Sequence, residues 1–307
     1  MFNRCEFNKI FNSKVDLNTK SIPIRFMKRI YLPFILFSLL FFQALGQQKD
    51  SVSNESKSKQ HVYRIKWYID APIIVGGLVS NYYGVRVLKG KKGIDEATVL
   101  TLGPEDVHKF DRGATRQNPA FAETAMHMSD ITLTTTIILP GLLLFDKKIR
   151  QDAVRIGVIY LTTISLMSNC YSWGVGRINR YRPYVYNPNE SIERRTRNGS
   201  KNSFYGGHAA AAATCSFFAA KVFADYHKGS KLVPVLYGLA VIPPALTAYF
   251  RYKAGMHFPS DLIVGVIAGA AIGIVVPELH KPRKKNKNMS FDPVIGPYQG
   301  FSMTYKF

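Results

Sequence analysis

The sequence predicts an all-α fold with a core bundle of six membrane-embedded helices, and three observations support this fold class. Hydrophobic residues make up 47% of the 307 residues, a share that excludes disordered and collagen-like chains. They gather into six long apolar stretches separated by polar connections, which is the pattern of buried or membrane-spanning helices. The last two stretches carry almost no charge, as expected of helices that cross a lipid bilayer.

The six apolar stretches cover residues 67–88, 130–146, 153–174, 208–226, 232–250 and 262–279. Stretches 232–250 and 262–279 lack the polar face of a surface helix, which favours membrane spans. In the last stretch Gly265, Gly269 and Gly273 recur every four residues and would let another helix approach closely. Because several stretches are only about 17 residues long, fully buried helices of a soluble bundle are the alternative.

The chain divides into an N-terminal extension with an export segment, a polar spacer, a helical core and a basic tail, over residues 1–46, 47–66, 67–279 and 280–307. Residues 27–46 have the basic start, apolar stretch and small final residues of a secretory signal, so that Met27 is a candidate start site. An uncleaved membrane anchor is the alternative. The last eight residues, GFSMTYKF, alternate apolar and polar side chains and predict one strand that docks on the protein.

The charge of the connections predicts how the bundle lies in a membrane. The short connections and the tail from His280 are basic, whereas the connections at 89–129 and 175–207 are long. The positive-inside rule then places the short connections in the cytoplasm and the long loops on the periplasmic side. A cleaved signal followed by six spans would reverse this orientation, so either the N-terminal segment is not a simple signal or some stretches do not cross.

The 41 Lys and Arg residues exceed the 20 Asp and Glu residues by 21, a balance that suits nucleic acid, anionic lipid or phosphate-bearing ligands. Because this charge lies next to apolar helices, we expect a membrane and a phosphorylated lipid or small phosphoester as partners, and no nucleic acid. The three cysteines lack the spacing of a disulfide framework or a zinc site.

Three polar clusters fall at predicted helix ends on the same side of the bundle, and the first is rich in arginine. It contains Arg180 and Arg182, followed by further basic residues in the loop, namely Arg194, Arg195, Arg197 and Lys201. Guanidinium groups suit bidentate contacts with phosphate and stay charged at any working pH. Contact with lipid headgroups or water is the alternative role for arginines beside a membrane.

The second cluster, Tyr205 to His208, immediately precedes an alanine-rich stretch. Glycine at the start of a helix lets backbone N–H groups approach an anion, and we assign this role to Gly207. His208 is then placed to donate a proton to a leaving oxygen. A structural cap is the alternative role for this histidine.

The third cluster runs from Arg251 to Asp261 and includes His257. His257 and Asp261 stand four residues apart at the start of the sixth helix, so the carboxylate can accept a hydrogen bond from one imidazole nitrogen and direct the other outward. A helix cap formed by Asp261 is the alternative, but it leaves Arg251 and His257 without a role.

Together these residues describe phosphoryl transfer without a metal ion or other cofactor. Arg182 and Arg251 would hold the phosphate, with backbone donors from Gly207. His257 would attack phosphorus with Asp261 orienting its ring, and His208 would protonate the leaving group and then activate water. The sequence has no second carboxylate and no Cys/His cluster near these residues that would indicate a metal site.

The three clusters resemble the motifs K-x6-R-P, P-S-G-H and S-R-x5-H-x3-D of the type 2 phosphatidic acid phosphatase and vanadium-dependent haloperoxidase superfamily. Here they stand as V-x6-R-P, Y-G-G-H and F-R-x5-H-x3-D, and the similarity spans roughly residues 67–279. The resemblance implies a six-helix core, a phosphohistidine on His257 and an acid role for His208. It also implies a hydrolase of the membrane-associated branch, acting on undecaprenyl pyrophosphate, a phosphatidate-like lipid or a lipid A phosphate.

The chain departs from the family's pattern at two phosphate donors. Val175 stands at the lysine position and Gly206 at the serine position, and each lost donor is worth about 1.5–3 kcal/mol as a charge-assisted bond. Arg177 lies nearly on the opposite helix face from Val175, so we expect Arg180 to supply the missing contact, ahead of Lys201.

Two other functions use the same pocket. One is a catalytically degenerate membrane protein that binds anionic lipid headgroups, which the residues at 175 and 206 favour. The other is haloperoxidase chemistry with bound vanadate, which the apolar spans disfavour.

Overall fold

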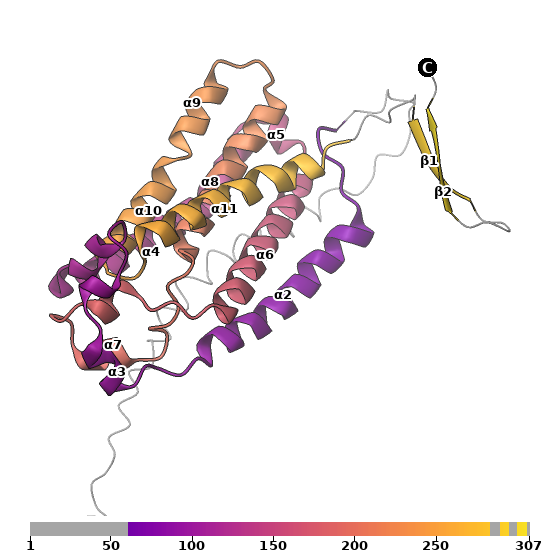
Figure 1. Ribbon diagram of the computed structural model, residues 1–307. Helices are drawn as coiled ribbons and strands as arrows, with labels where there is room; N and C mark the ends of the chain where they lie inside the picture. Colours follow the sequence, from indigo (N-terminus) through magenta and orange to yellow (C-terminus); the bar gives the residue numbers. More distant parts are fainter. Residues whose placement is uncertain (1–60, 283–288, 295–299, 306–307) are drawn as a thin grey trace, which may run out of the picture. The chain divides into compact units, whose positions relative to one another are not determined.

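The computed structural model describes residues 61–282, 289–294 and 300–305, and it is mostly helical (Figure 1). The all-α prediction is therefore confirmed. The candidate signal at residues 27–46 lies outside the described residues.

The long helices are α2 (Trp67–Lys89), α4 (Ala122–Ile138), α6 (Ala153–Arg177), α8 (Gly207–Tyr226), α10 (Ile242–Lys253) and α11 (Pro259–Leu279). Shorter helices are α3 (Glu96–Thr101), α5 (Lys147–Arg150), α7 (Ile192–Thr196) and α9 (Leu232–Leu239). The 3-10 turns are η1 (Pro104–Asp106), η2 (Arg112–Arg116), η3 (Pro119–Phe121), η4 (Leu139–Phe145) and η5 (Pro183–Tyr186).

Every predicted apolar stretch is helical, but two have different limits. The second begins earlier than residue 130, because the Asn118 side chain accepts a hydrogen bond from the Ala120 N–H and starts a turn that leads into α4. The fifth is divided into α9 and α10. Pro243 and Pro244 lack an N–H group, so they fit the first turn of α10 but not the interior of one continuous helix.

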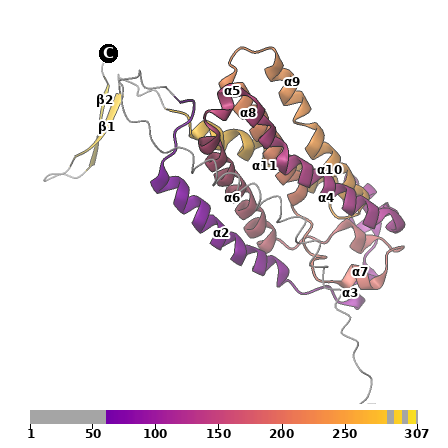
Figure 2. The ribbon, with the colours of Figure 1, turned by 180° about the vertical axis from the view of Figure 1, so that it is seen from behind.

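Helix α8 lies at the centre of the bundle and packs against α4, α6, α10 and α11, while α2 covers α6 (Figures 1 and 2). The predicted close approach at the glycines of α11 is confirmed. A Cβ atom added to Gly269 would lie 2.1 Å from the carbonyl oxygen of Ala210, and one on Gly273 would lie 2.5 Å from that of Thr214. The two backbones are in contact because these positions have no side chain.

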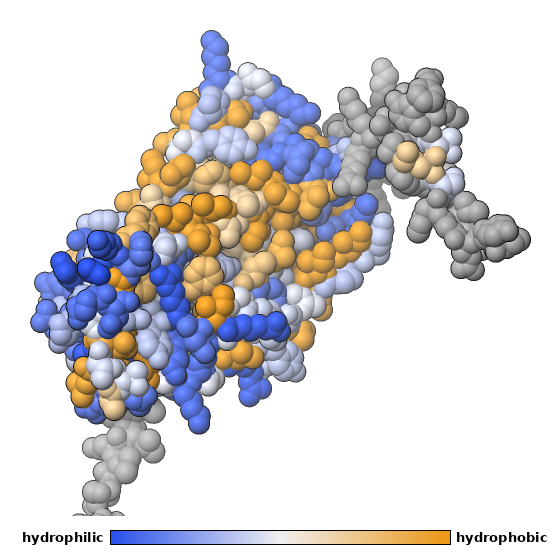
Figure 3. All heavy atoms as spheres, in the orientation of Figure 1, coloured by the Kyte–Doolittle hydropathy of each residue, from blue (hydrophilic) through white to orange (hydrophobic). Residues whose placement is uncertain are grey.

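Four helical segments are long and apolar enough to cross a membrane, namely Pro119–Phe145, Ala153–Arg177, Leu232–Lys253 and Pro259–Leu279. Apolar side chains such as Ile267, which is 64% exposed, cover their outward faces. Figure 3 shows these side chains across the middle of the bundle and hydrophilic ones around α3 and α7 at one end. Helices α2 and α8 are not among the four segments, so fewer of the predicted stretches qualify as spans than the sequence suggested.

A buried polar network lies at the end of α8 away from its first residue. Asp225 accepts hydrogen bonds from the Tyr63 hydroxyl at 2.7 Å and from Lys221 at 2.8 Å, and Lys221 also contacts Glu278 at 2.5 Å. Each buried charge therefore has a partner of opposite sign. The network joins the segment before α2 to α8 and α11.

The predicted C-terminal strand is present as β2 (Gly300–Tyr305), and it pairs antiparallel with β1 (Met289–Val294). The sequence did not predict β1. This strand contains Pro293, which has no backbone N–H to donate to the ladder.

Candidate active site

The loops that follow α6 and α10 bring the three polar clusters together at the start of α8. Backbone hydrogen bonds fold the first loop back on itself, from Arg182 N to Ser200 O at 2.8 Å and from Ser203 N to Arg180 O at 3.0 Å. The Gly206 N–H then donates to the carbonyl of Asp261 at 3.0 Å, which joins the start of α8 to the start of α11.

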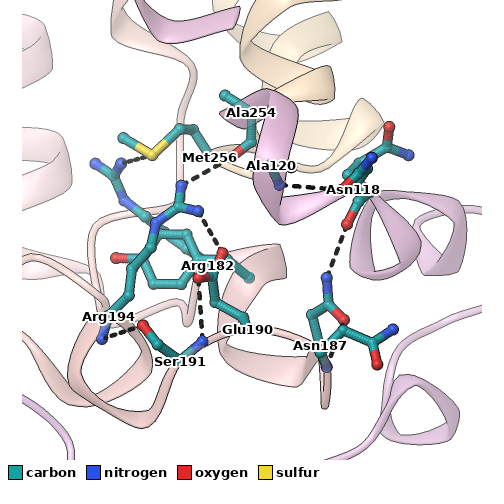
Figure 4. A network of polar contacts seen from close by, with 12 residues as sticks. Asn118, Ala120, Arg182, Asn187, Glu190, Ser191, Arg194, Ala254 and Met256 are labelled. Atoms are coloured by element: carbon teal, nitrogen blue, oxygen red, sulfur yellow. Dashed lines mark hydrogen bonds and ion pairs between the residues drawn. The ribbon is translucent and has the colours of Figure 1, made fainter. Parts of the chain in front are cut away.

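Arg182 and Arg251 form the positively charged centre of this site. The Nε atoms of both are buried and have no hydrogen-bond partner among the described residues. Arg182 Nη1 donates to the Met256 sulfur at 3.0 Å (Figure 4). Burial lowers the pKa of Arg182, but a guanidinium group stays protonated in proteins. Two guanidinium groups with buried, unused Nε donors are suited to an anion with several oxygen atoms.

His257 is 2% exposed, and the carbonyl oxygen of Ser203 fixes its ring. The Nδ1 atom lies 2.6 Å from that oxygen, which can only accept, so Nδ1 carries the proton and Nε2 the lone pair. Burial, with the positive charges of Arg182 and Arg251, holds the pKa of His257 well below its usual value. The imidazole is therefore neutral at physiological pH, which is the nucleophilic form.

The structure corrects the predicted pairing of Asp261 with His257. The Asp261 carboxylate accepts instead from the Ser203 hydroxyl at 2.6 Å, from the Phe258 N–H at 3.1 Å and from Arg180. Helix α11 begins at Pro259, so Asp261 stands at its third position and turns back to cap the first turn. Asp261 is therefore linked to His257 indirectly, since the Ser203 hydroxyl donates to Asp261 and the Ser203 carbonyl accepts from His257.

The structure also corrects the predicted role of Arg180 as a phosphate contact. Its Nη2 donates to Asp111 at 2.7 Å, and its Nη1 donates to Ser260 at 3.0 Å and to Asp261. Its guanidinium group also lies over the Phe258 ring, 4.5 Å from the centroid. Both Nη atoms of Arg180 are thus directed at partners within the protein, and Arg180 joins three segments of chain.

Other loop arginines have similar structural roles. Arg194 pairs with Glu190 and donates to the Ala254 carbonyl at 3.1 Å (Figure 4). Arg195 is 5% exposed and donates to the carbonyls of Val185 and Val99, each at 2.7 Å. These residues hold the loop in place around the site.

Asp130 is a site residue that the sequence analysis missed. Its Oδ1 atom accepts from Arg251 Nη2 at 2.6 Å and lies 3.3 Å from His208 Nε2. Desolvation and the charge of Arg251 lower the pKa of His208 to about 4, against the opposing effect of Asp130. One signal could have revealed Asp130, because a carboxylate in an otherwise uncharged membrane-type stretch commonly has a function.

The predicted residues thus separate into two groups. Arg182, Arg251 and His208 lie close enough to His257 for their charges to act on it. Arg180 and Asp261 lie in a supporting layer around Ser203. Among the described residues, no three His, Cys, Asp or Glu side chains are grouped so as to hold a metal ion.

The model of the PAP2 superfamily matches residues 134–285, a range that contains all three clusters. The chain belongs to the PAP2 superfamily.

Two solved structures are similar to this PAP2 chain. A transmembrane PAP2-type phosphatidylglycerolphosphate phosphatase from Bacillus subtilis is 18% identical, with a TM-score of 0.39, and the match covers 72% of this chain and 100% of that one. Aquifex aeolicus LpxE is 23% identical, with a TM-score of 0.33, and the match covers 55% and 92%. No curated protein matches the sequence.

In this PAP2 chain the two positions that depart from the family motifs, Val175 and Gly206, are closed to new side-chain donors. Val175 is fully buried, and Lys91 Nζ donates to its carbonyl at 2.6 Å. A Cβ atom on Gly206 would lie 2.8 Å from Leu262 Cδ2, so a serine there would need the leucine to move.

Proposed function

We propose that the chain is a metal-independent phosphatase that hydrolyses a phosphomonoester or pyrophosphate bond through a phosphohistidine on His257. The observation that carries this proposal is the pair of unused, buried Nε donors of Arg182 and Arg251 beside a neutral histidine. The phosphate would lie between the two guanidinium groups, where charge on its equatorial oxygens is matched.

The reaction has two balanced steps. The Nε2 lone pair of His257 attacks phosphorus, the bond from phosphorus to the leaving oxygen breaks, and His208 gives that oxygen a proton. Water then attacks the phosphohistidine, His208 takes the proton, and phosphate leaves with His257 restored. Desolvation and the charge of Arg251 keep the pKa of His208 low, and the negative charge of a bound phosphate would raise it, so that the acid forms when substrate binds.

A lipid substrate is supported by the four segments apolar enough to span a bilayer and by the site at their ends. Undecaprenyl pyrophosphate, a phosphatidate-like lipid and a lipid A phosphate share the required phosphate and apolar tail. The basic short connection at residues 147–150, with the basic tail, supports a periplasm-facing site by the positive-inside rule.

A second candidate is a protein that binds anionic lipid headgroups without hydrolysing them. The loss of side-chain donors at Val175 and Gly206 favours this candidate. The two candidates predict the same ligand and differ in turnover.

The test measures phosphate release by the purified full-length protein from lipid and soluble phosphoesters, with and without a chelator. We expect the wild type to release phosphate at a rate that the chelator changes little. In His257→Ala the rate of phosphate release should fall at least 100-fold. His227→Ala is the matched control, because His227 contacts Asp146 outside the site. Equal background release by wild type and His257→Ala would support headgroup binding instead, and loss of turnover with chelator would exclude the metal-free mechanism.

A further inference from the structure

Tyr171 lies beside the start of α8, near both positions where the chain lacks the side-chain donors of the family motifs, Val175 and Gly206. It lies on α6 one turn before Val175, so both residues belong to the same helix face. The site therefore has an aromatic hydroxyl next to the helix position from which the family's lysine extends.

Close packing fixes the Tyr171 ring at the start of α8. A Cβ atom added to Gly207 would lie 2.2 Å from Tyr171 Cε2 and 2.7 Å from Cζ, the carbon that carries the hydroxyl. The ring also packs edge-to-face on Tyr205, with centroids 5.8 Å apart and planes at 80°. Glycine at 207 is thus required for the ring to lie against the first turn of α8.

The Tyr171 side chain lies near the two arginines of the site as well as the start of α8. It lies within electrostatic range of both Arg182 and Arg251. No hydrogen bond engages it within the part of the chain that the structure describes, and the ring is only partly buried. A donor held near two arginines and a helix N-terminus, without a protein acceptor among the described residues, is suited to an anionic oxygen.

We propose that the Tyr171 hydroxyl donates a hydrogen bond to an oxygen of the bound phosphate, as a third side-chain donor beside Arg182 and Arg251. This inference rests on the proposed function, because it concerns the same phosphate. Tyr171 takes over part of the task of the donors absent at Val175 and Gly206. The proton stays on the phenol throughout, so its contribution is to binding and to stabilising charge in the transition state.

Tyr171→Phe tests the proposal, because it removes only the hydroxyl and keeps the ring that packs on Gly207. We expect kcat/KM to fall by on the order of tenfold, and inhibition by orthovanadate to weaken by a similar factor. Tyr160→Phe is the matched control on the same helix. It removes a hydroxyl that donates to the Ile137 carbonyl at 2.8 Å, so it should lower the melting temperature and leave inhibition unchanged.

The outcomes separate this inference from the proposed function. If the wild type turns over substrate and Tyr171→Phe has the same kcat/KM and the same vanadate inhibition, the proposed role of Tyr171 is wrong. The proposed function is then unaffected. If the wild type shows no turnover, the thermal shift produced by orthovanadate is compared between the two proteins instead. A smaller shift in Tyr171→Phe supports the hydroxyl as a donor even in a non-hydrolytic site, whereas equal shifts, or none in either protein, would contradict it.

Discussion

Asp130 on α4 and Arg251 on α10 are joined by a hydrogen bond of 2.6 Å between Oδ1 and Nη2. The same oxygen lies 3.3 Å from Nε2 of His208. One carboxylate therefore contacts both Arg251, the proposed phosphate ligand, and His208, the proposed acid, and it links two helices that are more than a hundred residues apart in sequence.

Replacing Asp130 with Asn should separate these two effects. The amide keeps the shape but loses the charge that favours the protonated form of His208, so we expect kcat to fall by about tenfold. Phosphate affinity should hold or increase, because a negative charge beside the anion is removed. A pH profile of kcat checks this, since the limb controlled by His208 should move to lower pH. An unchanged profile would mean that Asp130 does not act on His208.

Removing Arg180 should reduce stability rather than phosphate binding. Arg180→Ala leaves Asp261 buried without its cation, which costs about 3 kcal/mol of unfolding free energy. We expect a lower melting temperature in detergent, with orthovanadate affinity of the remaining folded protein unchanged within about twofold. If affinity falls far more than stability, then Arg180 contacts the phosphate after all.

The histidine pKa values predict a loss of stability in acid. His208 titrates near 4 in the folded protein and near 6.5 when unfolded, so the unfolded chain takes up the proton first as pH falls. This contribution to stability is complete above about pH 6.5 and declines toward pH 4. We expect the melting temperature of the wild type to fall over this window, and to fall less in His208→Gln. Parallel curves for the two proteins would contradict the depressed pKa.

The contact between α8 and α11 depends on Gly269. Gly269→Ala places a methyl group 2.1 Å from the carbonyl oxygen of Ala210, so the helices must separate, at a cost of about 2 kcal/mol. Gly238→Ala in α9 is the control, since nothing lies within 4 Å of its added Cβ, and it should be neutral or slightly stabilising. Thermal unfolding of both variants checks the prediction, which is wrong if the two have the same melting temperature.

Much of the pocket could be read from the sequence because chemistry-bearing residues stood at the ends of apolar helices. Arg182, Arg251, His208 and His257 lie together in the structure, as their clusters suggested. Asp130 was missed because it belongs to no cluster, and only the packing of α4 on α8 and α10 brings it to His208.

The partners of each polar side chain were less predictable. The four-residue spacing of His257 and Asp261 favoured direct contact, but capping of α11 turns the carboxylate toward Ser203 and Arg180. Arg180 looked available for phosphate because its partner Asp111 is remote in sequence.

The sequence by itself determined the helical class, the apolar segments and the residue types of the pocket, because hydrophobic pattern and side-chain chemistry are local properties of the chain. Only the tertiary structure decided which polar groups satisfy one another and which remain open to a ligand. That outcome depends on which donors and acceptors from distant segments lie within hydrogen-bond distance, as when Asp111 and Asp261 both bind Arg180.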